Sequence, residues 1–327
     1  MQPDFQDILR CPRCRSILTP PPVRCANDSC ELSSTPFLVV DDQLVLVDFA
    51  DSILVKADFV DRSGAAPLSA KSSPLRDFVI YCYRKIAHPM NKAAHRLTVD
   101  MADRLRLTNP KAGKPRMLVI GGGLVGSGVE HLYDAEDIDL IGTDIFVSPS
   151  TRLVADGHKL PFADETFDAV LVQAVLEHVL TPQTVVEEIY RVLRPGGLVY
   201  ADTPFMQQVH EKAYDFTRFT VSGHRWLFRR FELIEAGASL GAGTALLWSI
   251  RYFIAACTGN WRLGQIAALP LLWLRFFDGR SRYQQDAASG VYFYGTKSSE
   301  SVHPRDMIKF YETQLVANKG GVAKRAS

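Results

Sequence analysis

Four cysteines near the start of the chain are spaced like the ligands of a metal ion. Cys11 and Cys14 stand in "CPRC" and Cys25 and Cys30 in "CANDSC", which gives the pattern C-x2-C-x10-C-x4-C. Four thiolates on two short knuckles can close a tetrahedral shell around Zn²⁺, with no open position for catalysis. We therefore predict a structural zinc site. Reduced free cysteines or two disulfides are the alternatives, since x4 is wider than the commonest knuckle.

A second group of residues suited to chemistry is the glycine-rich stretch "MLVIGGGLVGSG", which begins at Met117. Glycine costs conformational entropy, so its use after an apolar run indicates a tight turn or a ligand close to the backbone. If a helix follows at Val125–Tyr133, its free N–H groups suit an anionic or dipolar ligand. The glycines alone are a weak signal, because a turn that packs a helix on its strand would also use them.

Two aspartates follow the glycines at strand ends. Asp144 closes the next apolar run, about twenty residues after the glycines, and Asp156 follows a short run after that. An acidic side chain at the first position can accept hydrogen bonds from a ribose diol. Asp156 could accept from an adenine amino group. Taken singly, either residue could instead be a cap or a turn residue.

The elements that must position these residues alternate between strand and helix. We expect helices at Val125–Tyr133 and Thr184–Val192, and strands at Arg116–Ile120, Ile138–Thr143, Leu153–Ala155, Ala169–Gln173 and Leu198–Ala201. Such alternation predicts a parallel sheet with helices on both faces.

Longer motifs in the same region point to a known family. The segments "ADGHKLPFADETFDAVLVQAVLEHV" and "VLRPGGLVYADTPF" are far more specific than the glycines. From about 114 to 205 the chain resembles the class I S-adenosylmethionine-dependent methyltransferases of the type 11-like branch. The resemblance implies an α/β fold with a doubly wound, mostly parallel, Rossmann-like sheet of seven strands. It also implies S-adenosyl-L-methionine bound over the carboxyl ends of the first strands.

The resemblance also implies a set of cofactor-binding positions: Gly121, Gly122, Gly123, Asp144, Asp156, Gly157, His158, Gln173 and Ala174. The glycines would face the methionine and ribose, and Asp144 would hold the ribose hydroxyls. Asp156 would take the adenine amine, while Gln173 and Ala174 would flank the reacting methyl. One departure is Val119, where the family usually has an acidic residue that helps to hold the amino end of the cofactor.

The stretch "TPFMQQVHEKAYDFTRFTVSGHRWLF" should supply the acceptor chemistry. Methyl transfer from a sulfonium is an in-line displacement, so alignment dominates, and a base helps if the acceptor is a hydroxyl. We expect His210 to be that base, with Asp215 or Glu211 as its orienting partner, and His178 to line the pocket. The alternatives are an Asp215–Arg218 structural ion pair and a His178 that only caps; His224 would then pack in the core.

An apolar insertion spans residues 240–277. Its uncharged runs are each about a dozen residues or fewer, and a membrane-spanning helix needs roughly 18 or more. We expect buried or lid helices here. The alternative is an interfacial hairpin that touches lipid or an apolar substrate.

Composition bounds the remaining expectations. Hydrophobic residues make up 47% of the 327 residues, and the formal net charge is +1, so no global field would attract nucleic acid. The start of the chain lacks a signal-peptide pattern, so we expect a cytoplasmic location, with peripheral membrane contact through 240–277 left open. The sequence does not fix an oligomeric state.

The domain organisation that we predict follows from these features. A zinc-ribbon-like module at 1–60 and a linker at 61–74 precede a helical extension at 75–113, a methyltransferase domain at 114–300 and a C-terminal tail at 301–327, part of which can be disordered. We expect methyl transfer to a small molecule, a glycan or a lipid-linked intermediate. The alternatives are an RNA or protein methyltransferase guided by the ribbon, and a non-catalytic binding or scaffold protein.

Overall fold

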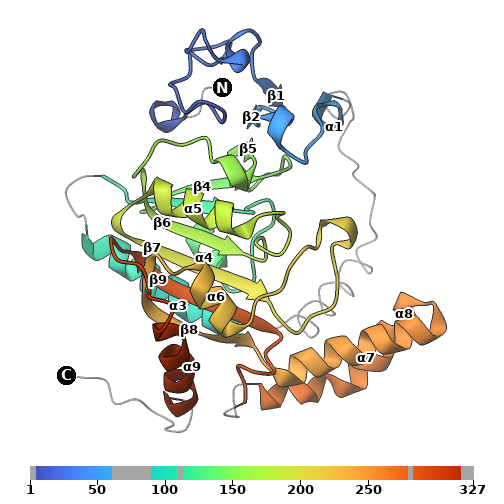
Figure 1. The fold of residues 1–327 in the computed structure, drawn as a ribbon. Coiled ribbons are helices and arrows are strands. Elements are labelled where there is room, and N and C mark those ends of the chain that lie inside the picture. The colour runs from blue at the N-terminus through green and yellow to red at the C-terminus, as the bar shows by residue number, and fades with distance from the viewer. Residues whose placement is uncertain (1–4, 61–89, 109–112, 279–282, 318–327) are drawn as a thin grey trace.

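The computed structural model describes residues 5–60, 90–108, 113–278 and 283–317 (Figure 1). The predicted linker at 61–74 and much of the predicted helical extension at 75–113 lie outside these residues. The described part of that extension is one helix, α3 (Lys92–Thr108).

A single nine-stranded sheet forms the centre of the molecule, in the order β1-β2-β5-β4-β3-β6-β7-β9-β8. Strands β2 to β7 run parallel, and β1, β8 and β9 are antiparallel to their neighbours. The bounds are β1 Leu38–Val40, β2 Gln43–Leu46, β3 Arg116–Ile120, β4 Asp139–Asp144, β5 Leu153–Ala155, β6 Phe167–Gln173, β7 Leu193–Pro204, β8 Phe231–Leu240 and β9 Gly290–Lys297.

This sheet confirms the predicted doubly wound, mostly parallel fold, with nine strands rather than seven. The additional strands, β1 and β2, come from the N-terminal region, where Leu44 of β2 pairs with Leu153 of β5. Their apolar side chains Val45 and Leu46 are buried there. Burial against β5 explains why these strands join the sheet, although their pairing partner lies about a hundred residues away.

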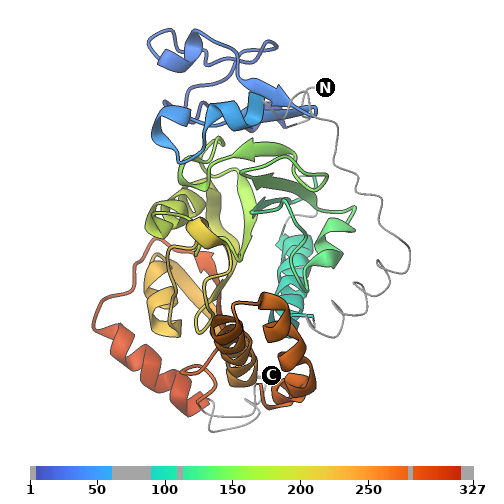
Figure 2. The same cartoon turned by 90° about the vertical axis from the view of Figure 1, so that its right-hand side faces the viewer.

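Helices cover both faces of the sheet (Figure 2). On one face α3 and α4 (Glu130–Tyr133) pack over β3 and β6, with Met101, Leu132 and Leu171 in one apolar cluster. On the other face α5 (Pro182–Val192) packs over the parallel strands, and α6 (Val221–Leu227) packs over β8 and β9. The sheet edge where the parallel strands end therefore lies between the two helical layers.

The helix expected from Val125 begins later than predicted. Residues 121–129 form a loop, and α4 begins only at Glu130. Gly128 explains the difference, because its φ of +89° is left-handed, and a Cβ there would lie 2.5 Å from the Asn91 backbone oxygen. The prediction that a helix N-terminus follows directly on the glycine turn is therefore wrong.

The apolar insertion folds as a helical hairpin that projects beyond the end of the sheet (Figure 1). It consists of α7 (Ala242–Thr258), α8 (Trp261–Ala268) and the 3-10 segment η7 (Leu269–Phe277). The chain reverses at Gly259, and Gly264 lets α8 approach α7, since a Cβ there would lie 2.3 Å from the Arg251 backbone oxygen. Within the described residues, every helix is too short or too polar to span a bilayer.

The N-terminal residues pack directly on the sheet. Phe5, Ile8 and Leu9 belong to the same apolar cluster as Leu153 and Phe162. Four short elements follow in this region: η1 Gln6–Ile8, η2 Glu31–Ser33, η3 Phe49–Asp51 and α1 Lys56–Val60. Near the other end, α9 (Asp306–Ala317) lies within the predicted tail, and residues 318–327 are outside the description.

Candidate active site

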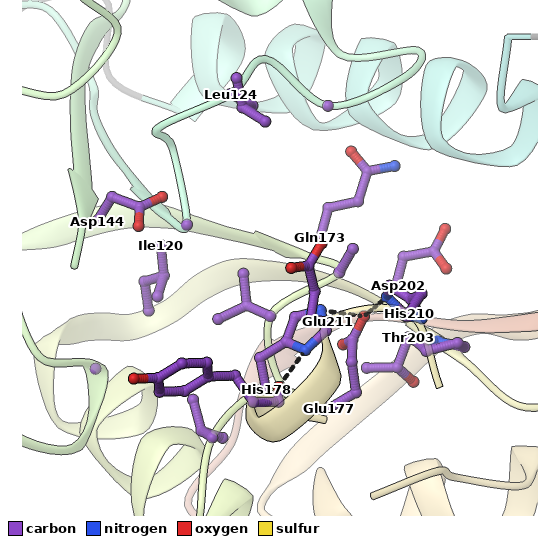
Figure 3. A pocket seen from close by; sticks show the side chains of 18 of the residues that line it. Ile120, Leu124, Asp144, Gln173, Glu177, His178, Asp202, Thr203, His210 and Glu211 are labelled. Atoms are coloured by element: carbon purple, nitrogen blue, oxygen red, sulfur yellow. Dashed lines mark hydrogen bonds and ion pairs between the residues drawn. The ribbon is translucent and has the colours of Figure 1, made fainter. Parts of the chain in front are cut away.

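A cavity of about 730 Å³ opens over the carboxyl ends of β3 to β7 (Figure 3). Every parallel strand from β3 to β7 contributes a residue at or just after its end, and the base of the hairpin contributes Thr244 and Trp248. Because parallel strands end at one edge of a sheet, residues far apart in sequence meet here.

Of the three consecutive glycines, Gly121 lines the cavity, whereas Gly122 and Gly123 are not among its lining residues. Gly121 has a φ of +76°, and a Cβ there would lie 2.1 Å from Cγ2 of Val175. The N–H of Gly122 donates to the Thr143 carbonyl at 2.9 Å. These glycines therefore shape the turn, and Gly121 alone of the three borders the cavity.

Asp144 lies at the end of β4 with its carboxylate held in place by backbone donors. Oδ2 accepts from the N–H of Gly123 at 2.8 Å and Oδ1 from that of Ile145 at 2.6 Å. Burial raises the pKa of Asp144, and these backbone donors oppose the shift. The residue lines the cavity, so its remaining lone pairs can accept from a ligand's hydroxyls.

Asp156, after β5, is anchored by His158 and Ser52. Its Oδ1 accepts from both the backbone N–H of His158 (2.9 Å) and ring Nδ1 (2.7 Å), and Oδ2 accepts from the Ser52 hydroxyl. Burial pushes the pKa of Asp156 up, but these donors outweigh it and the net direction is downward.

His158 works through Asp156. Its Nε2 accepts from the Thr181 N–H at 3.2 Å, which assigns the ring proton to Nδ1 and uses both nitrogens. His158 therefore positions the carboxylate. Gly157 lines the cavity beside it, at the start of η5 (Gly157–Lys159).

Gln173 and Ala174, at the end of β6, form hydrogen bonds with the loop after β3 and with β7. The Gln173 amide donates to the Ser127 carbonyl at 3.2 Å across Gly126, where a Cβ would lie 2.0 Å from Gln173 Oε1. That Oε1 is buried and accepts no hydrogen bond from the residues described. Ala174 has a φ of +53° and donates its N–H to the Asp202 carbonyl. A non-glycine residue held in this region indicates local strain at the site.

His210 and His178 face each other, with ring centroids 5.0 Å apart at 78°. His178 Nδ1 lies 2.6 Å from the Tyr214 carbonyl, and His210 donates its backbone N–H to Asp215 Oδ2 at 2.9 Å. The His210 ring Nδ1 lies 3.4 Å from that same oxygen. Burial lowers the pKa of His210, which favours a neutral imidazole.

Asp215 serves two partners. It pairs with Arg218, whose Nη2 lies 2.7 Å from Oδ2, and it also contacts His210. Burial opposes ionisation, yet the hydrogen bond from Arg218 leads the donors that lower the Asp215 pKa to about 2. The structural ion pair and the orienting contact that we expected as alternatives are therefore both present.

The sequence reasoning did not single out two acidic residues of this cavity. Glu177 is fully buried, and burial raises its pKa to about 8. Asp202, at the end of β7, accepts from Ser239 and Asn91, each at 2.8 Å, and burial raises its pKa to about 6. Both stand beside apolar residues in segments quoted for the family resemblance, and a carboxylate in such a run is the signal that could have found them.

Two further positions lie away from the cavity. Val119 is 4% exposed and packs in the apolar cluster under α3 and α4, while its neighbour Ile120 faces the cavity. His224 is buried next to Phe219 and Phe228, and burial lowers its pKa to about 3. His224 is therefore a neutral core residue, as the alternative interpretation held.

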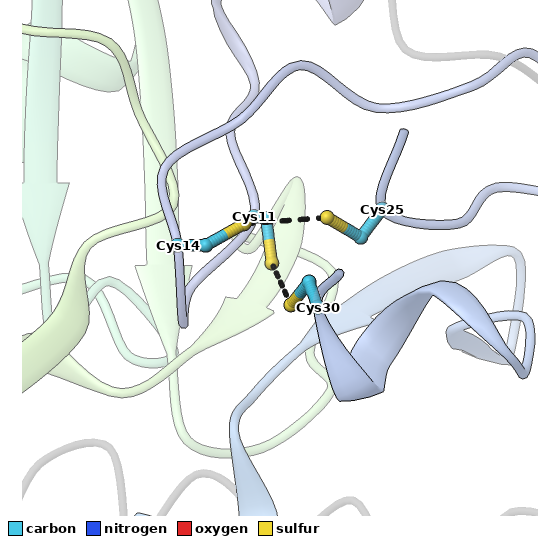
Figure 4. A group of neighbouring side chains, drawn as sticks. All are labelled: Cys11, Cys14, Cys25 and Cys30. Atoms are coloured by element: carbon cyan, nitrogen blue, oxygen red, sulfur yellow. Dashed lines mark hydrogen bonds between the residues drawn. The ribbon is translucent and has the colours of Figure 1, made fainter. Parts of the chain in front are cut away.

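The four cysteine side chains point toward one another in the N-terminal region (Figure 4). The sulfurs of Cys11 and Cys30 lie 3.9 Å apart, those of Cys14 and Cys25 3.3 Å, and all four lie within 4.8 Å of one another. With Zn–S bonds of about 2.3 Å, the sulfurs of a tetrahedral site lie about 3.8 Å apart. The donor set and spacing therefore fit Zn²⁺.

Comparison with known proteins identifies the class of the central segment. Residues 120–201 match a family model described as a methyltransferase domain. This match confirms the resemblance found in the sequence, and the chain carries a methyltransferase domain around the ends of β3 to β7.

Individual relatives match shorter parts of the chain. The ubiquinone/menaquinone biosynthesis C-methyltransferase UbiE of Roseobacter denitrificans is 38% identical over 71 residues, which cover 21% of this chain and 28% of the relative. An uncharacterized methyltransferase of Mycobacterium avium is 35% identical over 92 residues, covering 25% and 36%. The chain thus spans about a third or less of the length of these curated relatives.

Among solved structures, similarity extends to phosphoethanolamine N-methyltransferase 2 of Haemonchus contortus in complex with S-adenosyl-L-methionine. The TM-score is 0.42 at 17% identity, covering 76% of this chain and 61% of that chain.

Proposed function

We propose that this protein is an S-adenosyl-L-methionine-dependent methyltransferase acting on a small molecule, a glycan or a lipid-linked intermediate. The observation that carries the proposal is the single cavity into which Asp144, Asp156, His178 and His210 converge from separate strand ends and loops. Figure 3 shows Asp144 on one side of this cavity, apart from the group formed by His178, Glu177 and His210. The division suits a cofactor on one side and an acceptor on the other.

The cofactor side offers the groups that an adenosyl ligand needs. Asp144 presents lone pairs for the two ribose hydroxyls, and Asp156 an acceptor for an exocyclic amine, with Ile120 and Val179 as apolar wall. The buried Oε1 of Gln173 has no hydrogen-bond partner among the described residues and suits the ammonium group of the cofactor. Position 119, where the family usually has an acid for this group, faces the core in this chain. When bound, the cofactor would supply a methyl group already activated on a sulfonium.

On the acceptor side, the chain's contribution is alignment and proton handling. His178 donates a hydrogen bond from its Nδ1–H to the Tyr214 carbonyl, and Asp215 lies close to His210 Nδ1, so each Nε2 keeps a lone pair. A neutral imidazole so placed can orient an acceptor hydroxyl or take its proton. We therefore propose His210 and His178 as the acceptor-side residues, with Asp215 as the positioning residue for His210.

The hairpin favours an apolar or lipid-linked acceptor. Thr244 and Trp248 of α7 line the cavity, while large apolar side chains further along the hairpin are exposed, Phe253 at 69% and Phe276 at 70%. Leu240 to Phe277 carry three arginines and no acidic residue. This combination complements an anionic lipid surface. We propose peripheral membrane contact through the hairpin.

Calorimetry of the full zinc-loaded chain with S-adenosylmethionine and S-adenosylhomocysteine tests the proposal. We expect both ligands to bind at one site per chain. Absence of binding for folded protein would contradict the proposed activity and favour the scaffold alternative. If both ligands bind but methyl groups pass to RNA or protein in preference to lipids and glycans, the acceptor class is wrong.

A further inference from the structure

On the acceptor side, Glu177, His178 and His210 point toward one another nitrogen and oxygen atoms that lack hydrogen-bond donors within the described part of the chain. His178 Nε2 lies 3.5 Å and His210 Nε2 3.9 Å from Oε1 of Glu177, and ligand atoms of the three residues all lie within 4.8 Å of one another. Figure 3 shows the three together beside the cavity. Each of the three can offer a lone pair at this point, and a proton or a cation between them would satisfy the group.

The hydrogen bonds of the two histidines fix which nitrogen is free. His178 Nδ1 lies 2.6 Å from the Tyr214 carbonyl, which can only accept, so Nδ1 carries the proton. His210 Nδ1 lies 3.4 Å from both the Gln208 carbonyl and Asp215 Oδ2, which also only accept. Each Nε2 therefore carries a lone pair, and it lies 3.5 Å (His178) or 3.9 Å (His210) from Oε1 of Glu177. Histidines that bind metals show this arrangement, with the second nitrogen donating to a carbonyl or carboxylate.

Glu177 lacks the donors that a buried carboxylate needs. Neither of its oxygens accepts a hydrogen bond within the described part of the chain, and the side chain is fully buried. Arg218, the nearby cation, is committed to Asp215 and to the carbonyls of Gln207 and Gln208. A buried carboxyl group without a hydrogen-bond partner is costly in either protonation state, so a partner absent from the polypeptide would stabilise this arrangement.

We propose that Glu177, His178 and His210 form a binding site for a divalent first-row transition cation. Two imidazoles and one carboxylate are donors for Zn²⁺, Fe²⁺, Co²⁺ or Mn²⁺ rather than for Ca²⁺, which prefers oxygen ligands. Ligands about 2.0–2.2 Å from an ion lie roughly 3–3.5 Å apart, so a small contraction of the observed spacing suffices. Unlike the four-cysteine cluster, three protein ligands leave positions open toward the cavity.

The open positions would give the site a role toward the acceptor. An acceptor hydroxyl that coordinates such a cation would be acidified and would pass its proton to water, because His210 Nε2 would then be a ligand and could not act as the base. Trp248, whose ring centroid lies 6.2 Å from that of His210, covers this side from α7. Cation binding goes beyond the proposed methyl transfer and does not rest on it, because it can be measured without cofactor or acceptor.

Cobalt titration of the full chain, loaded with one equivalent of Zn²⁺ for the four cysteines and freed of excess zinc, tests this site by absorption spectroscopy and calorimetry. We expect one equivalent of Co²⁺ to bind with d–d bands and without thiolate-to-cobalt charge transfer, which separates this site from the cysteines. The single variants Glu177→Gln, His178→Asn and His210→Asn should each weaken Co²⁺ binding at least tenfold. His303→Asn, an exposed histidine on another part of the surface, should bind like the wild type.

Circular dichroism shows whether each variant is folded. If Glu177→Gln or His178→Asn unfolds, His210→Asn decides alone, because His210 lies half-buried on a loop. Failure of the wild type to bind Co²⁺ would overturn the proposal, as would equal binding by a folded ligand variant. Either result would indicate a proton shared within the cluster instead, and would leave the cofactor-binding test of the proposed function intact.

Discussion

Asp144 is the residue on which the proposed cofactor binding depends most directly. Its carboxylate is oriented by two backbone N–H groups and borders the cavity. Asp144→Ala should weaken S-adenosylhomocysteine binding at least about tenfold, or about 1.4 kcal/mol, because a partly buried charged acceptor is lost. Calorimetry measures this change. Asp103→Ala, an exposed aspartate on α3, is the matched control, and an unchanged affinity for Asp144→Ala would refute the assignment.

Gly121 tests the second residue-level claim, that the turn admits no side chain. Gly121→Ala meets both a left-handed φ of +76° and a Cβ contact of 2.1 Å with Val175. Gly196 has a similar φ of +72° with nothing within 4 Å, so Gly196→Ala isolates the backbone effect. We expect backbone strain of about 1–2 kcal/mol in both variants. Overpacking should add about 1–3 kcal/mol for Gly121→Ala alone.

Chemical denaturation of the two alanine variants measures the difference in the free energy of unfolding. Equal destabilisation would show that Val175 moves aside without cost. Loss of cofactor affinity confined to Gly121→Ala would add that the turn also borders the bound ligand.

At single positions, the sequence predicted which carboxylates line the cavity better than it predicted which side chains contact one another. The positions of Asp144 and Asp156 followed from the ends of apolar runs, and both line the cavity. Glu177 was not singled out, because its importance arises from a histidine on a loop over thirty residues away. Such a contact depends on how the loop folds back, which local pattern does not encode.

At the scale of elements, the cysteine module packs against the sheet domain through hydrogen bonds and ion pairs, and is not connected to it by the chain alone. The Arg10 N–H donates to the Pro161 carbonyl at 2.9 Å, and the Ala163 N–H donates to the Ile8 carbonyl at 2.8 Å. Asp48 links Arg13 of the module with Lys159, which follows β5. Unfolding of the module should therefore destabilise the sheet domain.

Removal of one cysteine ligand tests this coupling. Cys11→Ser should remove about one equivalent of bound zinc per chain and lower the thermal midpoint of the main unfolding transition, because the module packs on the sheet core. Elemental analysis and calorimetric melting measure the two effects. Cys257→Ser, an exposed cysteine on α7, is the control and should change neither. Zinc content equal to that of the wild type in folded Cys11→Ser protein would contradict a four-cysteine site.

Element types were predictable where the local sequence carried a clear apolar run or a clear helical period. The strand predicted at Arg116–Ile120 has those bounds, and α5 begins two residues before the predicted Thr184. The helix predicted from Val125 was wrong at its start, since Gly126 and Gly128 keep the chain in a loop. Backbone conformation at glycines is set by the neighbours that they approach, here Gln173 and Asn91, and these are not local in sequence.

For the molecule as a whole, the projecting hairpin predicts lipid association. The protein should co-sediment with vesicles containing anionic lipid and less with neutral vesicles, because the hairpin carries arginines and exposed aromatic side chains. The double variant Phe253→Ser, Phe276→Ser should reduce binding several-fold while leaving S-adenosylhomocysteine affinity unchanged. Ile308→Ser on α9, equally exposed at 68%, is the control. Equal sedimentation of all three proteins would show that the hairpin does not contact lipid.

The global arrangement was predictable only in its repeating part. Alternating strands and helices predicted the parallel sheet. The pairing of β2 with β5, and the approach of α7 to the ends of β6 and β7, join segments distant in the chain. Those contacts build one edge of the sheet and one wall of the cavity, and they follow from burial in three dimensions rather than from a sequence period.

The central claim is that neighbouring strand ends hold one adenosyl group on the cofactor side of the cavity. A crystal structure of the full chain with S-adenosylhomocysteine tests it most directly. We predict ribose hydroxyls at roughly 2.5–3.0 Å from the carboxylate of Asp144 and an adenine amine at roughly 2.7–3.2 Å from that of Asp156. A ligand bound elsewhere, or bound in this cavity without either contact, would contradict the account.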